Sequence, residues 1–248
     1  MRVAVAIPAR LGSSRLPRKV LSDIAGQSML HRTYQVALEA GCGPVVVLTD
    51  AEEVATEARA FGAAVMLTEP ALDSGTARIA SIIGRLEAQV VVNLQADAPL
   101  LDPDVVARSV RETGRSGASV TLPVARISDH RTLHDTSVVK VVRGHDGRAL
   151  YCSRAPLPHV RDVRSESWVD ATYFWAHVGL YAYRREFLEG FWDLPPSALE
   201  QAERLEQLRW LEAGVPLHTF EVEQQAPSVD TPADLERVRS LVVAETGA

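Results

Sequence analysis

The chain has almost no cysteine. Its 248 residues include only Cys42 and Cys152, which are far apart in the sequence. Two isolated thiols cannot provide the Cys-x-x-Cys spacing of a structural metal site. They also argue against a secreted domain that is held together by disulfides. A Cys-x-x-Cys metal site is therefore excluded, and we do not expect a disulfide scaffold.

Long apolar runs and an excess of positive charge are also missing. No run approaches the ~18 apolar residues that a membrane-spanning helix needs, and the first residues enter a strand-like segment with no signal-peptide pattern. We therefore expect a cytoplasmic protein with no membrane partner. The net charge is −6, which argues against broad nucleic-acid binding. It leaves room for an anionic small substrate, because a local cluster of cations can act within an acidic protein.

The composition that remains is that of a globular protein, with 46% hydrophobic and 23% charged residues. In the first half, short continuous apolar runs alternate with helical patterns. The expected strands are 3–7, 45–48, 63–67 and 90–94, and the expected helices are 29–40, 52–60, 76–87 and 102–113. Continuous apolar strands are typical of a parallel sheet with both faces covered. We see no internal repeat and no linker.

The second half has a different pattern. Strands are expected at 118–124, 138–142, 148–152, 173–183 and 217–222, with a loop over 155–170 and a helix over 198–213. Thr231 and Pro232 give a strong signal for the start of a last helix. The fold class predicted here is α/β, with a mostly parallel sheet and a smaller β-rich lobe.

A cationic loop follows the first expected strand. After Pro8, residues 9–19 include four cations, two serines and one glycine. Ligands of open α/β sheets bind outside the carboxyl ends of the strands, and Arg and Lys side chains suit a polyphosphate. The alternative is a solvated basic turn, which we disfavour because a strand leads directly into the loop. The loop lacks G-x-G-x-x-G and a Walker A pattern, which disfavours a dehydrogenase and a P-loop enzyme.

Two aspartates and one polar segment follow other strands. Asp97 follows the fourth expected strand and Asp230 precedes the last helix. Polyphosphate chemistry usually requires Mg²⁺, which takes one or two carboxylates, but both residues also fit an ordinary loop or helix-cap position. The segment Asp73-Ser74-Gly75-Thr76 fits a nucleotide contact. It fits an ordinary helix N-cap better when it is judged alone.

Together these segments resemble the 3-deoxy-manno-octulosonate (Kdo) cytidylyltransferases, over about residues 7–239. The most specific match is Ile7-Pro8-Ala9-Arg10 with Ser14-Arg15-Leu16-Pro17 and Lys19, which the sialic-acid cytidylyltransferases share in outline. Six further matches, at 73–76, 139–142, 149–155, 177–183, 205–209 and 229–235, are similar to the Kdo branch.

The resemblance implies a three-layer α/β/α fold of the nucleotide-diphospho-sugar transferase type, which is Rossmann-like. It implies a nucleotide-binding part over about 1–117, a sugar-binding and dimerisation lobe over about 118–222 and a closing helix over 231–244. The implied reaction is transfer of CMP from CTP to the anomeric hydroxyl of Kdo, with release of pyrophosphate, for lipopolysaccharide biosynthesis. The implied cofactor is Mg²⁺, and the implied assembly is a homodimer whose interface includes residues 173–183.

The resemblance also implies the roles of individual residues. Arg10, Lys19, Asp97 and Asp230 are the implied catalytic residues, and Asp97 and Asp230 are the metal ligands. The implied nucleotide-binding residues are Ala9, Arg10, Gly12, Ser13, Arg15, Lys19, Ser74, Gly75 and Thr76. The implied sugar-binding residues are Gln95, Arg154, His177, Tyr181, Glu206 and Gln207.

The sequence departs from the family pattern at several positions. Where the family has Gln-Gly-Asp-Glu-Pro, this chain has alanine at Ala96 and Ala98. Arg18 stands where the family tends to have glycine before Lys19. Two alternatives therefore stay open, namely the same chemistry on a Kdo analogue or a sialic acid, and a nucleotide-sugar-binding homologue that lacks catalysis.

Overall fold

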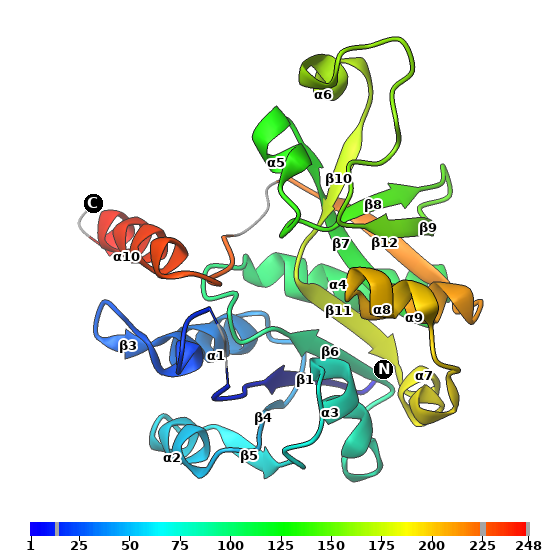
Figure 1. Ribbon diagram of the computed structural model, residues 1–248. Coiled ribbons are helices and arrows are strands. Elements are labelled where there is room, and N and C mark those ends of the chain that lie inside the picture. The colour runs from blue at the N-terminus through cyan, green and yellow to red at the C-terminus, as the bar shows by residue number, and fades with distance from the viewer. Residues whose placement is uncertain (13–14, 224–226, 247–248) are drawn as a thin grey trace.

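A single large sheet organises the chain. The computed structural model describes residues 1–12, 15–223 and 227–246 (Figure 1). The sheet has ten strands in the order β5-β4-β1-β6-β11-β7-β10-β8-β9, and β12 pairs with β7. Its first four members are β1 (Val3–Pro8), β4 (Val45–Thr49), β5 (Ala64–Leu67) and β6 (Val90–Leu94), which are mutually parallel. The α/β class and the four parallel strands of the first half are confirmed.

Helices cover both faces of this parallel half (Figure 1). Apolar residues of α1 (Met29–Glu39), α2 (Glu52–Ala60) and α4 (Pro103–Ser116) pack on one face, where Val5 and Ile7 of β1 also point. The opposite face, with Ala4 and Ala6, is covered by α3 (Gly75–Ser81), α7 (Arg185–Glu189) and α9 (Glu206–Glu212). Burial on both faces explains why β1, β4 and β6 are apolar at almost every position, with Thr49 and Asn93 as buried polar exceptions. β5 lies at the edge of the sheet and is partly exposed.

The second half extends the same sheet mainly with antiparallel strands. These are β7 (Val120–Ile127), β8 (Lys140–Arg143), β9 (Ala149–Ser153), β10 (Phe174–His177) and β11 (Leu180–Arg184), whereas β12 (Leu217–Val222) runs parallel to β7. The prediction of one continuous strand over 173–183 is wrong. The segment is interrupted between His177 and Leu180, where β10 ends and β11 begins, and both strands pair with β7.

Two long helices expected from the sequence are shorter. The helix expected over 76–87 ends at Ser81 and continues as a 3-10 turn, Ile83–Arg85. The helix expected over 198–213 is divided into α8 (Ala198–Glu203) and α9, because Arg204 has a left-handed backbone with φ 55°. The loop expected over 155–170 includes a 3-10 turn, Ser165–Ser167, and the start of α6 (Trp168–Ala171). The short helix α5 (His130–His134) was not expected.

The last helix, α10 (Pro232–Thr246), returns to the beginning of the chain (Figure 1). Its Leu235, Val238 and Val242 form a small core with Ile24 of the hairpin β2 (Asp23–Ile24) and β3 (Gln27–Ser28). The predicted start of this helix is confirmed, since the Thr231 hydroxyl and backbone N–H both donate to the Asp234 carboxylate. Among the helices in the described part of the chain, none has the length and apolar character needed to cross a membrane.

Candidate active site

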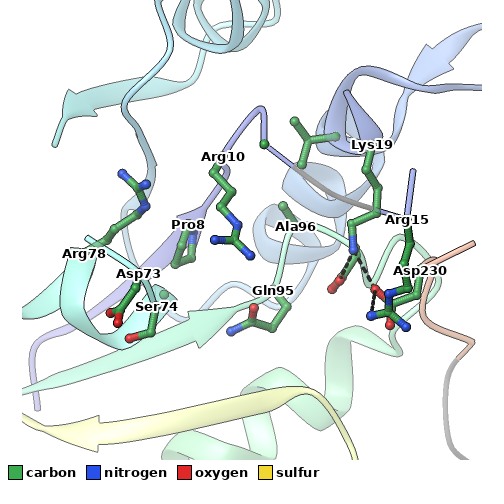
Figure 2. A pocket seen from close by; sticks show the side chains of 14 residues that line it. Pro8, Arg10, Arg15, Lys19, Asp73, Ser74, Arg78, Gln95, Ala96 and Asp230 are labelled. Carbon is green, nitrogen blue, oxygen red and sulfur yellow. Dashed lines mark hydrogen bonds and ion pairs between the residues drawn. The ribbon is translucent and has the colours of Figure 1, made fainter. Parts of the chain in front are cut away.

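A polar cleft lies at the carboxyl ends of β1 and β6, which are neighbours in the parallel sheet. It has a volume of about 260 Å³. Its lining residues are Pro8, Arg10, Gly12, Arg15, Lys19, Val20, Asp73, Ser74, Gly75, Arg78, Gln95, Ala96, Asp97 and Asp230. Figure 2 shows Ser74 on one side of this cleft and Lys19 with Asp230 on the other. We call it the cationic cleft.

Lys19 joins the two aspartates at one end of the cationic cleft. Its Nζ lies 2.6 Å from Asp97 Oδ2 and 3.0 Å from Asp230 Oδ1. The lysine side chain is 13% exposed, so the ammonium is largely removed from water. Burial by itself would lower the pKa of Lys19, but the two carboxylates outweigh that effect and raise the pKa above its ordinary value. Lys19 is therefore positively charged near neutral pH.

Backbone contacts bring the two aspartates together from distant parts of the chain. The Val229 N–H donates to the Asp97 carbonyl at 3.1 Å. The Thr33 hydroxyl, on α1, donates to the Ala96 carbonyl at 3.1 Å. The loop after β6 is thus attached both to α1 and to the segment that leads into α10. This attachment explains how carboxylates that are 133 positions apart in the sequence can meet.

The two arginines of the loop differ in their contacts. Arg15 Nη2 lies 3.1 Å from Asp230 Oδ1, so this guanidinium is already paired. Arg10 is exposed and has no ion-pair partner among residues 1–12, 15–223 and 227–246. Figure 2 shows its side chain within the cationic cleft, between the Ser74 side and the Lys19 side. An unpaired guanidinium in this position is available to an anionic ligand.

The segment around Ser74 forms the opposite wall. The Ser74 hydroxyl accepts the N–H of Ala77, so this residue is the N-cap that the sequence pattern favours. Gly75 approaches the sheet closely, because a Cβ there would lie 3.2 Å from Pro8 Cγ and 3.4 Å from Gln95 Nε2. Thr76 is fully buried behind this wall and does not line the cleft.

Arg78 is a residue of the cationic cleft that the sequence did not single out. It is buried, and its Nη2 lies 3.0 Å from the Asp50 carboxylate at the end of β4. Its Nη1 also donates to the Thr68 hydroxyl at 2.6 Å. Two features of the sequence point to it, namely Asp50 after an apolar strand and the position of Arg78 at the end of the polar segment that begins at Asp73. Arg78 therefore contributes a positive charge whose position is fixed by neighbouring groups.

A second cavity of about 200 Å³ adjoins the cationic cleft. Its lining residues are Gln95, Asp97, Ala98, Leu101, Ser137, Val138, Val139, His177, Val178, Gly179, Ser228 and Asp230. We call it the second cavity. It shares Gln95, Asp97 and Asp230 with the cationic cleft. Burial lowers the pKa of His177 to about 4, so its ring is neutral near neutral pH.

The remaining residues expected to bind sugar line neither of these cavities. Arg154 donates to three backbone carbonyls, those of Thr136, Glu203 and Arg204. The buried Tyr181 hydroxyl accepts a hydrogen bond from Gln207. The Glu206 carboxylate accepts the hydroxyl of Thr76 at 2.8 Å. Their assignment as sugar contacts stays a prediction.

Of the other residues expected to contact the nucleotide, only some line the cationic cleft. Gly12 lines the cationic cleft. Ala9 is fully buried and lines neither cavity. Ser13 lies outside the described residues. The site expected from the sequence is therefore assembled in large part, with Arg10, Lys19, Asp97 and Asp230 in one cleft.

The departures from the family pattern have specific structural consequences. Arg18 has a left-handed backbone, with φ 59°, so the chain takes a path there that favours glycine. Its guanidinium pairs with Glu53 on α2. Ala96 is not among the residues with positive φ, so alanine is accommodated there without backbone strain. Ala98 lines the second cavity, where it offers a methyl group instead of a carboxylate.

The donor set fits a hard divalent cation. Two carboxylate oxygens converge on one ammonium, so a single small cation at that point would meet both. Mg²⁺ is commonly bound through one or two carboxylates together with phosphate oxygens and waters. Within the described residues, no group of three or more His, Cys, Asp or Glu side chains is arranged to hold a metal. The cleft would thus need phosphate oxygens to complete the coordination.

Comparisons with known proteins agree on one kind of enzyme. The sequence model of the family described as "Cytidylyltransferase" matches residues 4–221. The chain is 41% identical to a 3-deoxy-manno-octulosonate cytidylyltransferase of Chlorobium limicola, over 100% of each chain. It is also 41% identical to one of Geobacter sulfurreducens, over 96% of this chain and 98% of the other.

One solved structure is similar along the whole chain. It is a CMP:2-keto-3-deoxy-manno-octonic acid synthetase in complex with CTP. It superposes with a TM-score of 0.92 at 40% identity and covers 99% of this chain and 100% of its own. The similarity includes the strands and loops from which both cavities are built.

Proposed function

The chain belongs to the cytidylyltransferase family, and on that premise we propose that it transfers the cytidylyl group of CTP to 3-deoxy-manno-octulosonate. In this reaction the anomeric hydroxyl of the sugar acid attacks the α-phosphate of CTP, and pyrophosphate leaves. Full-length relatives at 41% identity that carry this name support the proposal. So does the similarity to a synthetase that binds CTP.

The observation that carries the proposal is the junction of the two cavities. Gln95, Asp97 and Asp230 line both of them. A triphosphate in the cationic cleft and a sugar acid in the second cavity would therefore meet beside two carboxylates. Group transfer between two bound substrates requires such a shared boundary, because the attacking and leaving oxygens must lie on opposite sides of the same phosphorus.

We assign the triphosphate to the cationic side chains of the cleft. Arg10 has no competing ion pair in the described part of the chain, and Lys19 and Arg15 are paired only with aspartates. Arg10 and Lys19 would neutralise the negative charge that moves to the departing pyrophosphate, which is the main protein contribution to such a transfer. Ser74, Gly75 and Gly12 line the same cleft and would contact the nucleotide.

We assign a magnesium ion to Asp97 and Asp230. When bound, Mg²⁺ supplies Lewis-acid stabilisation of the phosphate oxygens. Lys19 would leave the two carboxylates when they hold the ion, and its ammonium would then be free to contact phosphate. This exchange of partners gives Lys19 a role both before and after the substrate binds.

We assign the sugar acid to the second cavity. His177 is neutral there and its Nε2 is buried without a hydrogen-bond partner in the described residues, so it can exchange a hydrogen bond with a sugar hydroxyl. Gln95 and Ser137 add polar groups to the same wall. The size of the cavity, about 200 Å³, suits a single sugar ring rather than an oligosaccharide.

The test is pyrophosphate release from CTP and Mg²⁺ with Kdo, with a sialic acid and without sugar. We expect release with Kdo only. Pyrophosphate release with the sialic acid but not with Kdo would show that the protein is a cytidylyltransferase with a different sugar substrate. The absence of release with every sugar would reject the enzyme and favour a homologue that only binds nucleotide-sugars.

We also propose a homodimer whose interface lies on the 118–222 lobe and includes the Tyr173 end of residues 173–183. The Tyr173 side chain is an exposed large aromatic, 61% accessible, with the Arg126 guanidinium 4.5 Å from its ring centroid. Exposed aromatic and arginine side chains are enriched in interfaces. Light scattering should give a dimer for the wild type and a monomer for Tyr173→Glu. A wild-type monomer at every concentration would contradict the proposal.

A further inference from the structure

A buried chain of hydrogen bonds connects the cleft with a carboxylate behind it. Gln95 Nε2 donates to Asn93 Oδ1 at 3.0 Å, and Asn93 Nδ2 donates to the Tyr183 hydroxyl at 3.1 Å. The Tyr183 and Thr76 hydroxyls are 2.8 Å apart, and Thr76 donates to Glu206 Oε1 at 2.8 Å. These five residues, which we call the relay, come from β6, β11, α3, α9 and the loop after β6.

The relay has only one direction when Glu206 is ionised, because a carboxylate only accepts hydrogen bonds. Thr76 has one hydroxyl proton and gives it to Glu206, so Thr76 must accept the proton of Tyr183. The Tyr183 oxygen then accepts from Asn93, whose amide oxygen in turn accepts from Gln95. The nitrogen of the Gln95 amide is thereby turned towards Asn93, and its oxygen remains for a ligand.

Water cannot replace the three inner members of the relay. Thr76, Asn93 and Tyr183 are all 0% exposed. A buried polar group that loses its partner carries a desolvation cost, which favours one arrangement of these three connected residues. At the end of the relay, Glu206 Oε1 is bonded to Thr76, whereas Oε2 is buried without a hydrogen-bond partner in the described residues. Gly75 allows this network to form, because a Cβ there would lie 3.4 Å from both the Asn93 and the Gln95 amide nitrogens.

We propose that Glu206 is a positioning residue that fixes the direction of the relay, so that Gln95 presents its amide oxygen to a hydroxyl of the sugar acid. The proposal rests on the function proposed above and specifies one recognition element of the same site. It also replaces a direct contact between Glu206 and the sugar by an indirect action through Gln95, the only member of the relay that lines either cavity described above.

The sharpest test is Tyr183→Phe, which removes one oxygen from the middle of the relay. Tyr183 is fully buried and cannot touch substrate, so a direct role is excluded. We expect the KM for Kdo to rise about five- to tenfold, as for the loss of one buried hydrogen bond, with the KM for CTP unchanged. Tyr34→Phe, a buried tyrosine of α1 on the other face of the sheet, is the matched control and should leave both constants unchanged.

A double-mutant cycle separates the relay from a direct sugar contact. Glu206→Ala should raise the KM for Kdo to the same extent as Tyr183→Phe, and the double variant should be no worse than either single variant. Glu206→Gln keeps an oxygen that accepts from Thr76, so it should recover most of the loss. If the two effects multiply, Glu206 acts independently of the relay and the proposal is wrong.

The outcomes are distinguishable from those of the proposed function. A wild type that is inactive with Kdo rejects the proposed function, whereas an active wild type with an unchanged Tyr183→Phe rejects only the relay. If Tyr183→Phe does not fold, as judged from its melting curve, the comparison of Glu206→Gln with Glu206→Ala decides. Equal values of the KM for Kdo in these two variants overturn the proposal.

Discussion

Lys19→Met should strengthen metal binding while it sharply lowers turnover. In the structure the ammonium occupies the point on which Asp97 and Asp230 converge, at 2.6 and 3.0 Å. Methionine retains most of the side-chain length but leaves both carboxylates without this cation. Because Lys19 and Mg²⁺ compete for the same two oxygens, the variant should bind Mg²⁺ better than the wild type in the absence of CTP.

The expected size follows from the contacts. A hydrogen bond to a charged group contributes about 1.5–3 kcal/mol, but the two aspartates are 26% and 34% exposed, and this exposure reduces the gain by screening. We therefore expect Lys19→Met to lose about 1–3 kcal/mol without metal. For a chain of this length, that is a fall in Tm of about 2–10 °C. Turnover should fall about 100-fold or more, as for the removal of one group that stabilises a developing charge.

The assay is a melting curve at several concentrations of MgCl2. We expect Mg²⁺ to raise the Tm of Lys19→Met by clearly more than that of the wild type, and Asp97→Asn in the same background to remove the difference. The pKa of Lys19 is raised, so its contribution is complete below its ordinary value of 10.5 and is lost only as the pH rises through the higher folded value. The comparison should therefore not change between about pH 7 and about pH 9. Equal responses of wild type and variant to Mg²⁺ would refute the shared site.

Three further predictions concern other parts of the chain. Gly75→Ala should raise the KM for both substrates several-fold, because the added Cβ would lie 3.2 Å from Pro8 Cγ and 3.4 Å from Gln95 Nε2. Initial-rate kinetics measure both KM values, and unchanged values would contradict the close approach of Gly75 to the sheet. Burial raises the pKa of the Cys152 thiol to about 12, so mass spectrometry should find it unmodified after native treatment with iodoacetamide near pH 8, and modification without unfolding would be the contrary result. Burial raises the pKa of Glu206 to about 7. Hydrogen bonds from the Thr76 and Ser74 hydroxyls lower this pKa, the charges of Glu200 and Asp73 raise it, and the Tyr181 and Tyr183 rings also face the carboxyl group. The carboxylate therefore forms only above about pH 7. The KM for Kdo should fall as the pH rises through about 7, and Glu206→Gln should lack this step; a step of the same size in both proteins would show that another group titrates.

The parallel half of the sheet could be predicted because burial of each strand leaves a pattern within a short segment of the sequence. Both faces of β4 and β6 are covered, so these strands are nearly continuous apolar runs with clear ends. Polar residues that follow such runs lie at the carboxyl edge of the sheet. This rule places Arg10 and Asp97 near one another, and the structure brings them into one cleft.

Other features depend on contacts that no local pattern records. The division between α8 and α9 occurs at Arg204, an arginine in a left-handed conformation, within a segment whose leucine spacing favours one helix. The Arg154 guanidinium donates hydrogen bonds to three backbone carbonyls. Asn93 lies inside an apolar strand, where only the folded structure shows that its amide belongs to a polar network. The partners that hold Arg154 and Asn93 include Glu203 and Tyr183, which are distant in the sequence.

The most direct measurement is a phosphorus NMR spectrum of CTP, Mg²⁺ and Kdo with the purified protein. We predict the loss of the three CTP signals and the appearance, in equal amounts, of pyrophosphate and one phosphodiester signal from a CMP-sugar. Asp97→Asn, with an unchanged melting curve, should leave the CTP signals intact. Conversion of CTP into CDP and phosphate, or a CTP spectrum that does not change, would contradict cytidylyl transfer at this site.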